Sequence, residues 1–172
     1  VSFSLPYLLS YFLQTLYGLA DLFVVGQYCG VSSITAVSIG SQVMHMVTVI
    51  VVGLAMGTTV TTAQSVGAND VARTKRVVGN TVTLFMVFSL LMAAGLVGWV
   101  GDIVSLMSTP VEAATETTSY LTICFIGIPF IVAYNIIASI YRGMGDSKSP
   151  MYFIAIACIT NVALDIVFIG VL

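Results

Sequence analysis

The chain has 172 residues, of which 59% are hydrophobic and only 7% are charged. A soluble globular domain carries about 25% charged residues, so this composition excludes that class of protein. The net charge of −2 offers no basic surface for nucleic acid. The composition therefore predicts an all-α membrane protein.

Five apolar segments are long enough to cross a hydrocarbon core of about 30 Å. We expect these five transmembrane helices at about 5–28, 34–65, 77–100, 111–141 and 150–172. In the first, Pro6 stands in the first turn, where a helix tolerates proline. Asp21 lies about 11 Å from the end of this segment, counting 1.5 Å per residue. It is therefore expected below the membrane interface.

The second segment is rich in small residues. Gly53 and Gly57 form a small-xxx-small pair, which predicts close approach by another helix. His45 is the only histidine of the chain. It is interpreted as a hydrogen-bonded structural residue, with a proton relay as the alternative. The three cysteines show no metal or redox spacing and are expected to pack.

The bases predict the orientation. All five fall in two predicted loops, which are the loop after the second segment and the loop after the fourth: Arg73, Lys75, Arg76, Arg142 and Lys148. Because cytoplasmic loops are rich in Lys and Arg, the amino terminus is expected in the cytoplasm and the carboxyl end outside. The third loop, 101–110, is expected without a helix, and Pro129 is expected to kink the fourth segment.

The last segment carries the clearest polar interruption. Asn161 and Asp165 are four residues apart, so they share one face of a helix. A carboxylate near the middle of a membrane helix costs about 2.5–3.5 kcal/mol and faces the protein interior. Asp21, Tyr120 and Asp165 are each expected about 11–13 Å below the outer ends of their helices. These side chains form the best candidate site.

Three stretches resemble one transporter family. YGLADLFVVGQ, QSVGANDVARTKR and RGMGDSKSP followed by NVALD are similar, in order and spacing, to the multidrug and toxic compound extrusion (MATE) transporters. The resemblance implies a twelve-helix protein with two six-helix lobes. This chain would be the amino-terminal lobe without its sixth helix. The missing initiator Met and the unflanked last segment also lead us to expect a fragment.

The resemblance implies a function as well. Members export cationic or amphipathic drugs in exchange for H⁺ or Na⁺ and need no cofactor. The family's ion site matches Asp21, Tyr120, Asn161 and Asp165, and its helix-bending proline matches Pro6. Two carboxylates in one apolar pocket cannot both stay ionised cheaply, so the pair can hold a proton, or Na⁺ at Asp21, Asn161 and Asp165. A multi-pass protein of the plasma membrane, here the bacterial inner membrane, is expected.

Three alternatives stay open. Gly143 to Asp146 match the G-x-G-D string of intramembrane aspartyl proteases, but Asp146 lies in an inside loop, far in depth from Asp21 and Asp165. We therefore expect no enzyme. A lipid-linked oligosaccharide flippase of the same superfamily would carry bases in its central cavity, whereas all bases here are in loops. A non-transporting membrane subunit is the third alternative.

Overall fold

The computed structural model describes residues 4–28 and 30–170, with the side chains at 4–7, 11, 17, 21, 28, 165, 166, 169 and 170 outside the description. This part of the chain consists of helices joined by short turns and contains no strand. The helices are α1 (Ser4–Tyr28), α2 (Val31–Gly67), α3 (Val71–Gly98), α4 (Val100–Leu106), α5 (Val111–Ile126), α6 (Ile128–Gly143) and α7 (Lys148–Gly170).

The helices confirm the all-α membrane class. Three apolar stretches are long enough to cross a membrane: Leu8–Gln27 in α1, and the whole of α2 and α3. The pair α5 and α6 makes a fourth crossing that is bent by 47°. The fifth predicted crossing falls in α7, which has 23 residues and whose described part includes the apolar stretch Lys148–Leu164. That fifth crossing stays a prediction.

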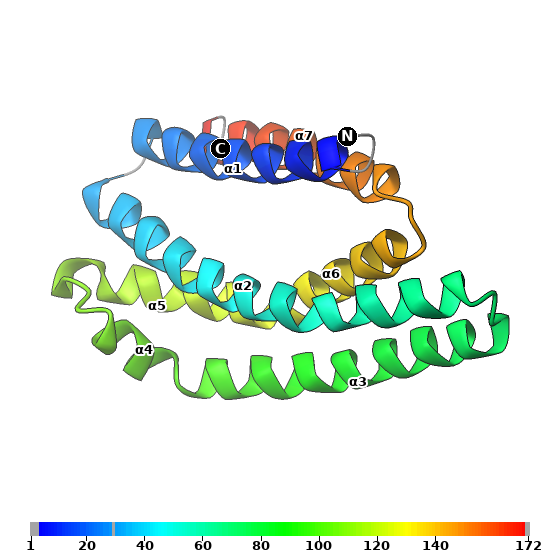
Figure 1. Ribbon diagram of the computed structural model, residues 1–172. Coiled ribbons are helices and arrows are strands. Elements are labelled where there is room, and N and C mark those ends of the chain that lie inside the picture. The colour runs from blue at the N-terminus through cyan, green and yellow to red at the C-terminus, as the bar shows by residue number, and fades with distance from the viewer. Residues whose placement is uncertain (1–3, 29, 171–172) are drawn as a thin grey trace.

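The helices form two groups. In Figure 1, α1 and α7 lie side by side and run in the same direction, and both are separated from α3 by the width of the molecule. The second group packs α2 against α5 and α6, with α3 covering α6 and the short α4 packed on α5. The groups are linked where α1 meets α2 and where α6 meets α7. The two predicted base-rich connections, α2–α3 and α6–α7, lie at the same end of the molecule (Figure 1).

The core sits inside the second group. Its centre is fully buried and combines Val51 and Ala55 of α2 with Leu121, Phe125, Ile128 and Val132 of α5 and α6. Large apolar side chains on the outer face of α3 are exposed instead, such as Leu84 at 64% and Leu91 at 70%. Lipid tails are as apolar as leucine, so this exposure is not unfavourable in a membrane and cohesion comes from close packing.

Helix α2 runs parallel to α5 and α6, with nearly the same register at Ser41 and at Thr59. Ser41 lies opposite Tyr120 and Thr59 opposite Ser139, at sequence separations of 79 and 80. The buried residues of α2 recur every three or four positions, from Ala36 through Val47 to Ser65. This spacing forms one stripe along the helix, and the stripe faces α5 and α6.

Gly53 and Gly57, the predicted small-residue pair, make no close helix contact within the described structure. Gly53 and Gly57 are exposed, and no other atom within the described structure lies within 4 Å of an added Cβ. The close approach instead uses Gly143 of α6, where an added Cβ would lie 2.8 Å from the Thr59 carbonyl oxygen. Gly53 and Gly57 fall outside the stripe of buried residues, so the helix contact expected there stays a prediction.

Helix α3 begins six residues earlier than predicted. Asp70 is its N-cap, and the carboxylate accepts a hydrogen bond from the Arg73 backbone N–H at 2.8 Å. An aspartate in this position satisfies one of the free N–H groups at the helix start. Arg73, Lys75 and Arg76 therefore lie in the first turns of α3 and not in a loop. Polar residues had suggested a loop, but a helix can continue past the membrane surface and carry such residues there.

The loop expected at 101–110 was also wrong in part, because α4 occupies its first half. Val104 is 5% exposed, and Val100, Ile103 and Met107 pack on the core beside it. These positions lie on one face of a helix. The pattern covers only two turns, so it could not be recognised within an apolar sequence.

The predicted bend of the fourth segment is present. It falls at Gly127, two residues before Pro129, where α5 ends and α6 begins. Proline has no N–H to continue the α5 ladder, and the next two N–H groups, of Phe130 and Ile131, both bond to the Gly127 carbonyl.

Candidate functional site

Asn161 is the best-described member of the predicted site. It lies on α7, and its Oδ1 atom is buried without a hydrogen-bond partner in the described part of the chain. A buried acceptor left without a donor costs about 1–3 kcal/mol, so it calls for a ligand or another explanation. Carboxamide oxygen is a hard ligand of the kind that alkali and alkaline-earth cations prefer.

The face of α7 that carries Asn161 can be followed along the helix. Ile154 is buried, Cys158 is half-buried, and the Cys158 Sγ atom lies 4.0 Å from the Leu13 carbonyl oxygen of α1. Positions 154, 158, 161 and 165 are spaced by four, three and four residues, so they form one stripe. Asn161 and position 165 therefore lie on the face of α7 that meets α1.

The contact between Cys158 and Leu13 also sets the register of α1 and α7. The two helices are parallel (Figure 1), so levels can be counted from this contact. Position 165 is about 10.5 Å further along α7 and position 21 about 12 Å further along α1, at 1.5 Å per residue. The backbones at 21 and 165 are therefore at nearly the same level.

Position 21 also falls on the buried face of α1. It comes three helical turns after Ser10, which is 8% exposed, and one turn before Val25, which is 5% exposed. The side chains of Asp21 and Asp165 themselves lie outside the described residues, as does that of Pro6. The backbone of Pro6 belongs to the first turn of α1, which begins at Ser4.

Tyr120 lies in a different part of the molecule from these residues. Its ring packs on Gly40 of α2, where an added Cβ would lie 2.5 Å from Cε1, and its hydroxyl is 3.5 Å from the Ser41 hydroxyl. Over the residues that the structure describes, α5 contacts neither α1 nor α7. Equal depth in the membrane does not make helices neighbours. The inclusion of Tyr120 in one site with Asp21 and Asp165 stays a prediction.

Gly40 and Ser41 are the contact residues that sequence reasoning did not find. Ser38, Ser41, Gln42 and His45 form a polar run in an apolar helix, and this run was the available signal. His45 is exposed and lies one turn further along α2 than Ser41. Neither of its two predicted roles is decided by these positions.

Asp146 has a structural role at the start of α7. Its Oδ1 accepts hydrogen bonds from the backbone N–H groups of Lys148 and Ser149 at 3.0 and 3.1 Å, and its Oδ2 accepts one from the Ser149 hydroxyl at 2.5 Å. The Ser149 donors hold the pKa of this carboxyl below its ordinary value, with smaller contributions from the N–H and charge of Lys148. These bonds explain the aspartate of the G-x-G-D string without catalysis.

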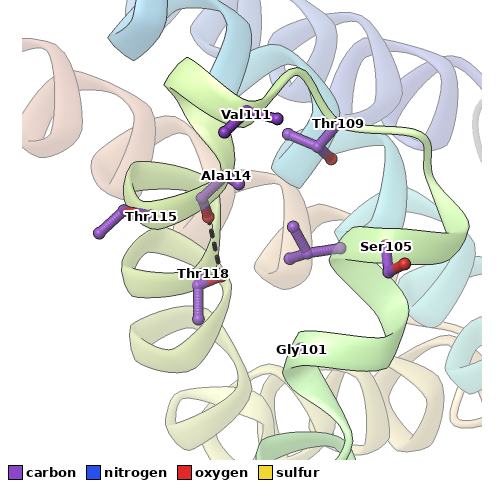
Figure 2. A pocket seen from close by; sticks show the side chains of 8 residues that line it. Gly101, Ser105, Thr109, Val111, Ala114, Thr115 and Thr118 are labelled. Atoms are coloured by element: carbon purple, nitrogen blue, oxygen red, sulfur yellow. Dashed lines mark hydrogen bonds between the residues drawn. The ribbon is translucent and has the colours of Figure 1, made fainter.

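An open pocket of about 370 Å³ lies elsewhere, between α4 and the start of α5. Figure 2 shows Ser105, Thr109, Thr115 and Thr118 around it, with the Thr118 hydroxyl bonded to the Ala114 carbonyl at 2.8 Å. Its lining residues carry no charge, so the pocket differs in chemistry from the predicted cation site.

Comparison with known proteins identifies close relatives of this lobe. The sequence model of the MatE family matches residues 6–167. The chain is 32% identical to the probable multidrug resistance protein YoeA of Bacillus subtilis over 94% of this chain and 35% of the relative. It is 30% identical to the probable multidrug resistance protein YpnP of the same species over 99% of this chain and 38% of the relative.

The fold also matches solved structures. A crystal structure of MATE in the bent conformation superposes with a TM-score of 0.91 at 27% identity, over 98% of this chain and 38% of that one. The chain thus spans somewhat more than a third of the proteins that it matches.

Proposed function

The chain belongs to the MatE family, and on that premise we propose that it is the amino-terminal lobe of a secondary transporter that exports drugs in exchange for H⁺ or Na⁺. The lobe would act as part of a longer chain that supplies a sixth helix and a carboxy-terminal lobe. The exported compounds would be drugs, as the multidrug resistance names of two relatives suggest, and we propose that these drugs are cationic or amphipathic. Neither enzymatic turnover nor a cofactor enters this proposal.

The register of α1 and α7 is the observation that carries the proposed cation site. It supports placing Asp21 and Asp165 at one level along two adjacent parallel helices. Asn161 lies one turn from position 165 on the same face, and its Oδ1 is a buried acceptor without a hydrogen-bond partner among the described residues. Two carboxylates and one amide oxygen would together make a site for a single positive charge.

The proposed mechanism is a competition between that charge and the drug. Two carboxylates in an apolar setting do not both stay ionised cheaply, so binding H⁺ or Na⁺ stabilises the pair. Neutralising the pair removes the attraction for a cationic drug. A coupling ion can shift the transporter between states only by binding those states with different affinity. We assign this difference to α1, whose first turn contains Pro6 and which packs directly on α7.

The orientation is part of the proposal. Arg73, Lys75, Arg76, Arg142 and Lys148 gather where α2 meets α3 and where α6 meets α7, at one end of the lobe (Figure 1). Placing that end in the cytoplasm follows the positive-inside rule and puts the amino terminus inside. The plasma membrane, here the bacterial inner membrane, is the proposed location. The positions of these bases do not favour a flippase with a basic cavity.

Substitution of the two aspartates in the full-length protein tests the proposal. Asp21→Asn and Asp165→Asn are expected to abolish drug resistance in cells while leaving normal amounts of protein in the membrane. Asp102→Asn is the matched control, because Asp102 is an exposed acid on α4 outside the proposed site. Normal resistance in both of the first two variants would contradict the assignment of the site.

A further inference from the structure

Helix α2 begins without a cap of its own. Its N-cap residue is Gly30, which has no side chain to bond to the free N–H groups of the first turn. The hydroxyl of Ser32 in that turn donates a hydrogen bond to Glu116 Oε1 of α5 at 2.8 Å. The Ser33 hydroxyl also interacts with the same carboxylate. We call this group, Ser32, Ser33 and Glu116, the outer clasp.

The charge of Glu116 suits this position. The free N–H groups at a helix start give it a partial positive charge, so a carboxylate held there is favoured. Here the carboxylate comes from another helix, and it therefore joins two elements. Glu116 fixes the first turn of α2 against α5 at the point where the chain arrives from α1.

The outer clasp shares its helix faces with the Tyr120 contact. Glu116 and Tyr120 are one turn apart on α5, and Ser33 and Gly40 are two turns apart on α2, so each pair lies on one face. Between the two contacts the helices meet through small buried residues, Ala36 at 3% and Thr117 at 0% exposure. Side chains this small interlock little, so they do little to prevent α2 from rotating or sliding against α5. The clasp supplies that constraint.

We propose that Glu116 is a positioning residue for Tyr120. By holding the outer end of α2, it keeps Gly40 under the tyrosine ring and Ser41 opposite the tyrosine hydroxyl. Glu116 does not touch the proposed cation site itself. The inference rests on the proposed ion-coupled transport and on the prediction, made from the family resemblance, that Tyr120 contributes to ion coupling.

The test uses the full-length protein in lipid vesicles and measures two quantities. The first is amide hydrogen exchange at Ile34, Thr35 and Ala36, which reports whether the start of α2 is held. The second is the concentration of H⁺ or Na⁺ that gives half-maximal drug transport, compared with the maximal rate. The variants are Glu116→Ala, Glu116→Gln and the double change Ser32→Ala with Ser33→Ala. Glu112→Ala is the control, an exposed acid one turn earlier on α5.

Glu116→Ala is expected to speed exchange about two- to fivefold, the lower part of the range for loss of a helix N-cap. It should also raise the half-maximal ion concentration with little change in maximal rate. The double serine change should have the same effect as Glu116→Ala, because it removes the other side of the same contact. Glu116→Gln, which keeps an acceptor oxygen, should recover part of the loss. Glu112→Ala should change neither quantity.

Two results would overturn the inference. Unchanged exchange in Glu116→Ala would mean that no clasp exists, and faster exchange with an unchanged half-maximal ion concentration would mean that the clasp does not position Tyr120. If the unsubstituted protein transports without any ion dependence, the proposed function fails instead. The exchange measurement still decides whether the clasp exists in that case.

Discussion

Replacing Gly143 by alanine should destabilise the crossing of α2 and α6. The added Cβ would lie 2.7 Å from Thr62 Cβ and 2.8 Å from the Thr59 carbonyl oxygen, and the latter is backbone that cannot rotate away. Overpacking of this kind costs about 1–3 kcal/mol. Alanine regains roughly 0.5–1 kcal/mol relative to glycine within a helix, and less at the end of α6. The net loss should be about 1–2 kcal/mol.

Thermal unfolding of the purified full-length protein measures this loss. A loss of 1 kcal/mol lowers the midpoint by about 2–4 °C for a unit of 150–250 residues and by less for a longer cooperative unit, so the midpoint should fall by up to about 8 °C. Gly79→Ala on α3 is the control, because its Cβ meets no other atom of the described structure within 4 Å, and it should be neutral or slightly stabilising. An unchanged midpoint for Gly143→Ala would refute the close α2–α6 packing described here.

Three further predictions concern the site and its surroundings. Gly40→Ala should displace the Tyr120 ring and cost about 1–3 kcal/mol in unfolding free energy, whereas Tyr120→Phe should keep the packing and lower ion affinity about two- to tenfold, the effect of one hydrogen bond. Asn161→Leu should abolish ion binding, measured by calorimetry, and leave ion-free stability unchanged or raise it by about 1 kcal/mol, because it removes an unpaired buried acceptor. Stability lost without loss of ion binding would argue against a ligand there. Asp146 has a lowered pKa, so its bonds to α7 persist above the ordinary carboxyl value of about 3.9 and are lost as the pH falls through the lowered value. Amide exchange at the start of α7 should therefore rise in acid after correction for intrinsic rates, and Asp146→Asn should remove this pH dependence.

Much of the fold could be predicted because long apolar runs in a membrane protein have few alternatives to helix. The bend at Gly127 was equally readable, since Pro129 removes a backbone donor. The short helix α4 and the early start of α3 were not. Both depend on local hydrogen bonds and packing, at Asp70 and Val104, that a hydropathy pattern does not contain.

The sequence predicts the depth of the candidate site residues in the membrane, but it does not predict which of their helices lie next to each other. Helix length gives the level of Asn161, Asp165 and Tyr120, yet it does not decide which helices are neighbours. In the structure, α1 packs against α7, and Tyr120 of α5 contacts α2. Similarly, Gly53 and Gly57 matched a packing motif, but only the positions of the other helices show that Gly40 and Gly143 make the close contacts.

The central claim is that one positive charge, held between α1 and α7, is exchanged for a drug. The most direct measurement reconstitutes the full-length protein in vesicles, adds a cationic drug on one side and follows H⁺ with a pH-sensitive dye, or Na⁺ with an ion-sensitive dye. The account predicts ion movement opposite to the drug, and the loss of both fluxes in Asp165→Asn. Drug movement without any counter-movement of either ion, or coupled exchange that persists in Asp165→Asn, would contradict it.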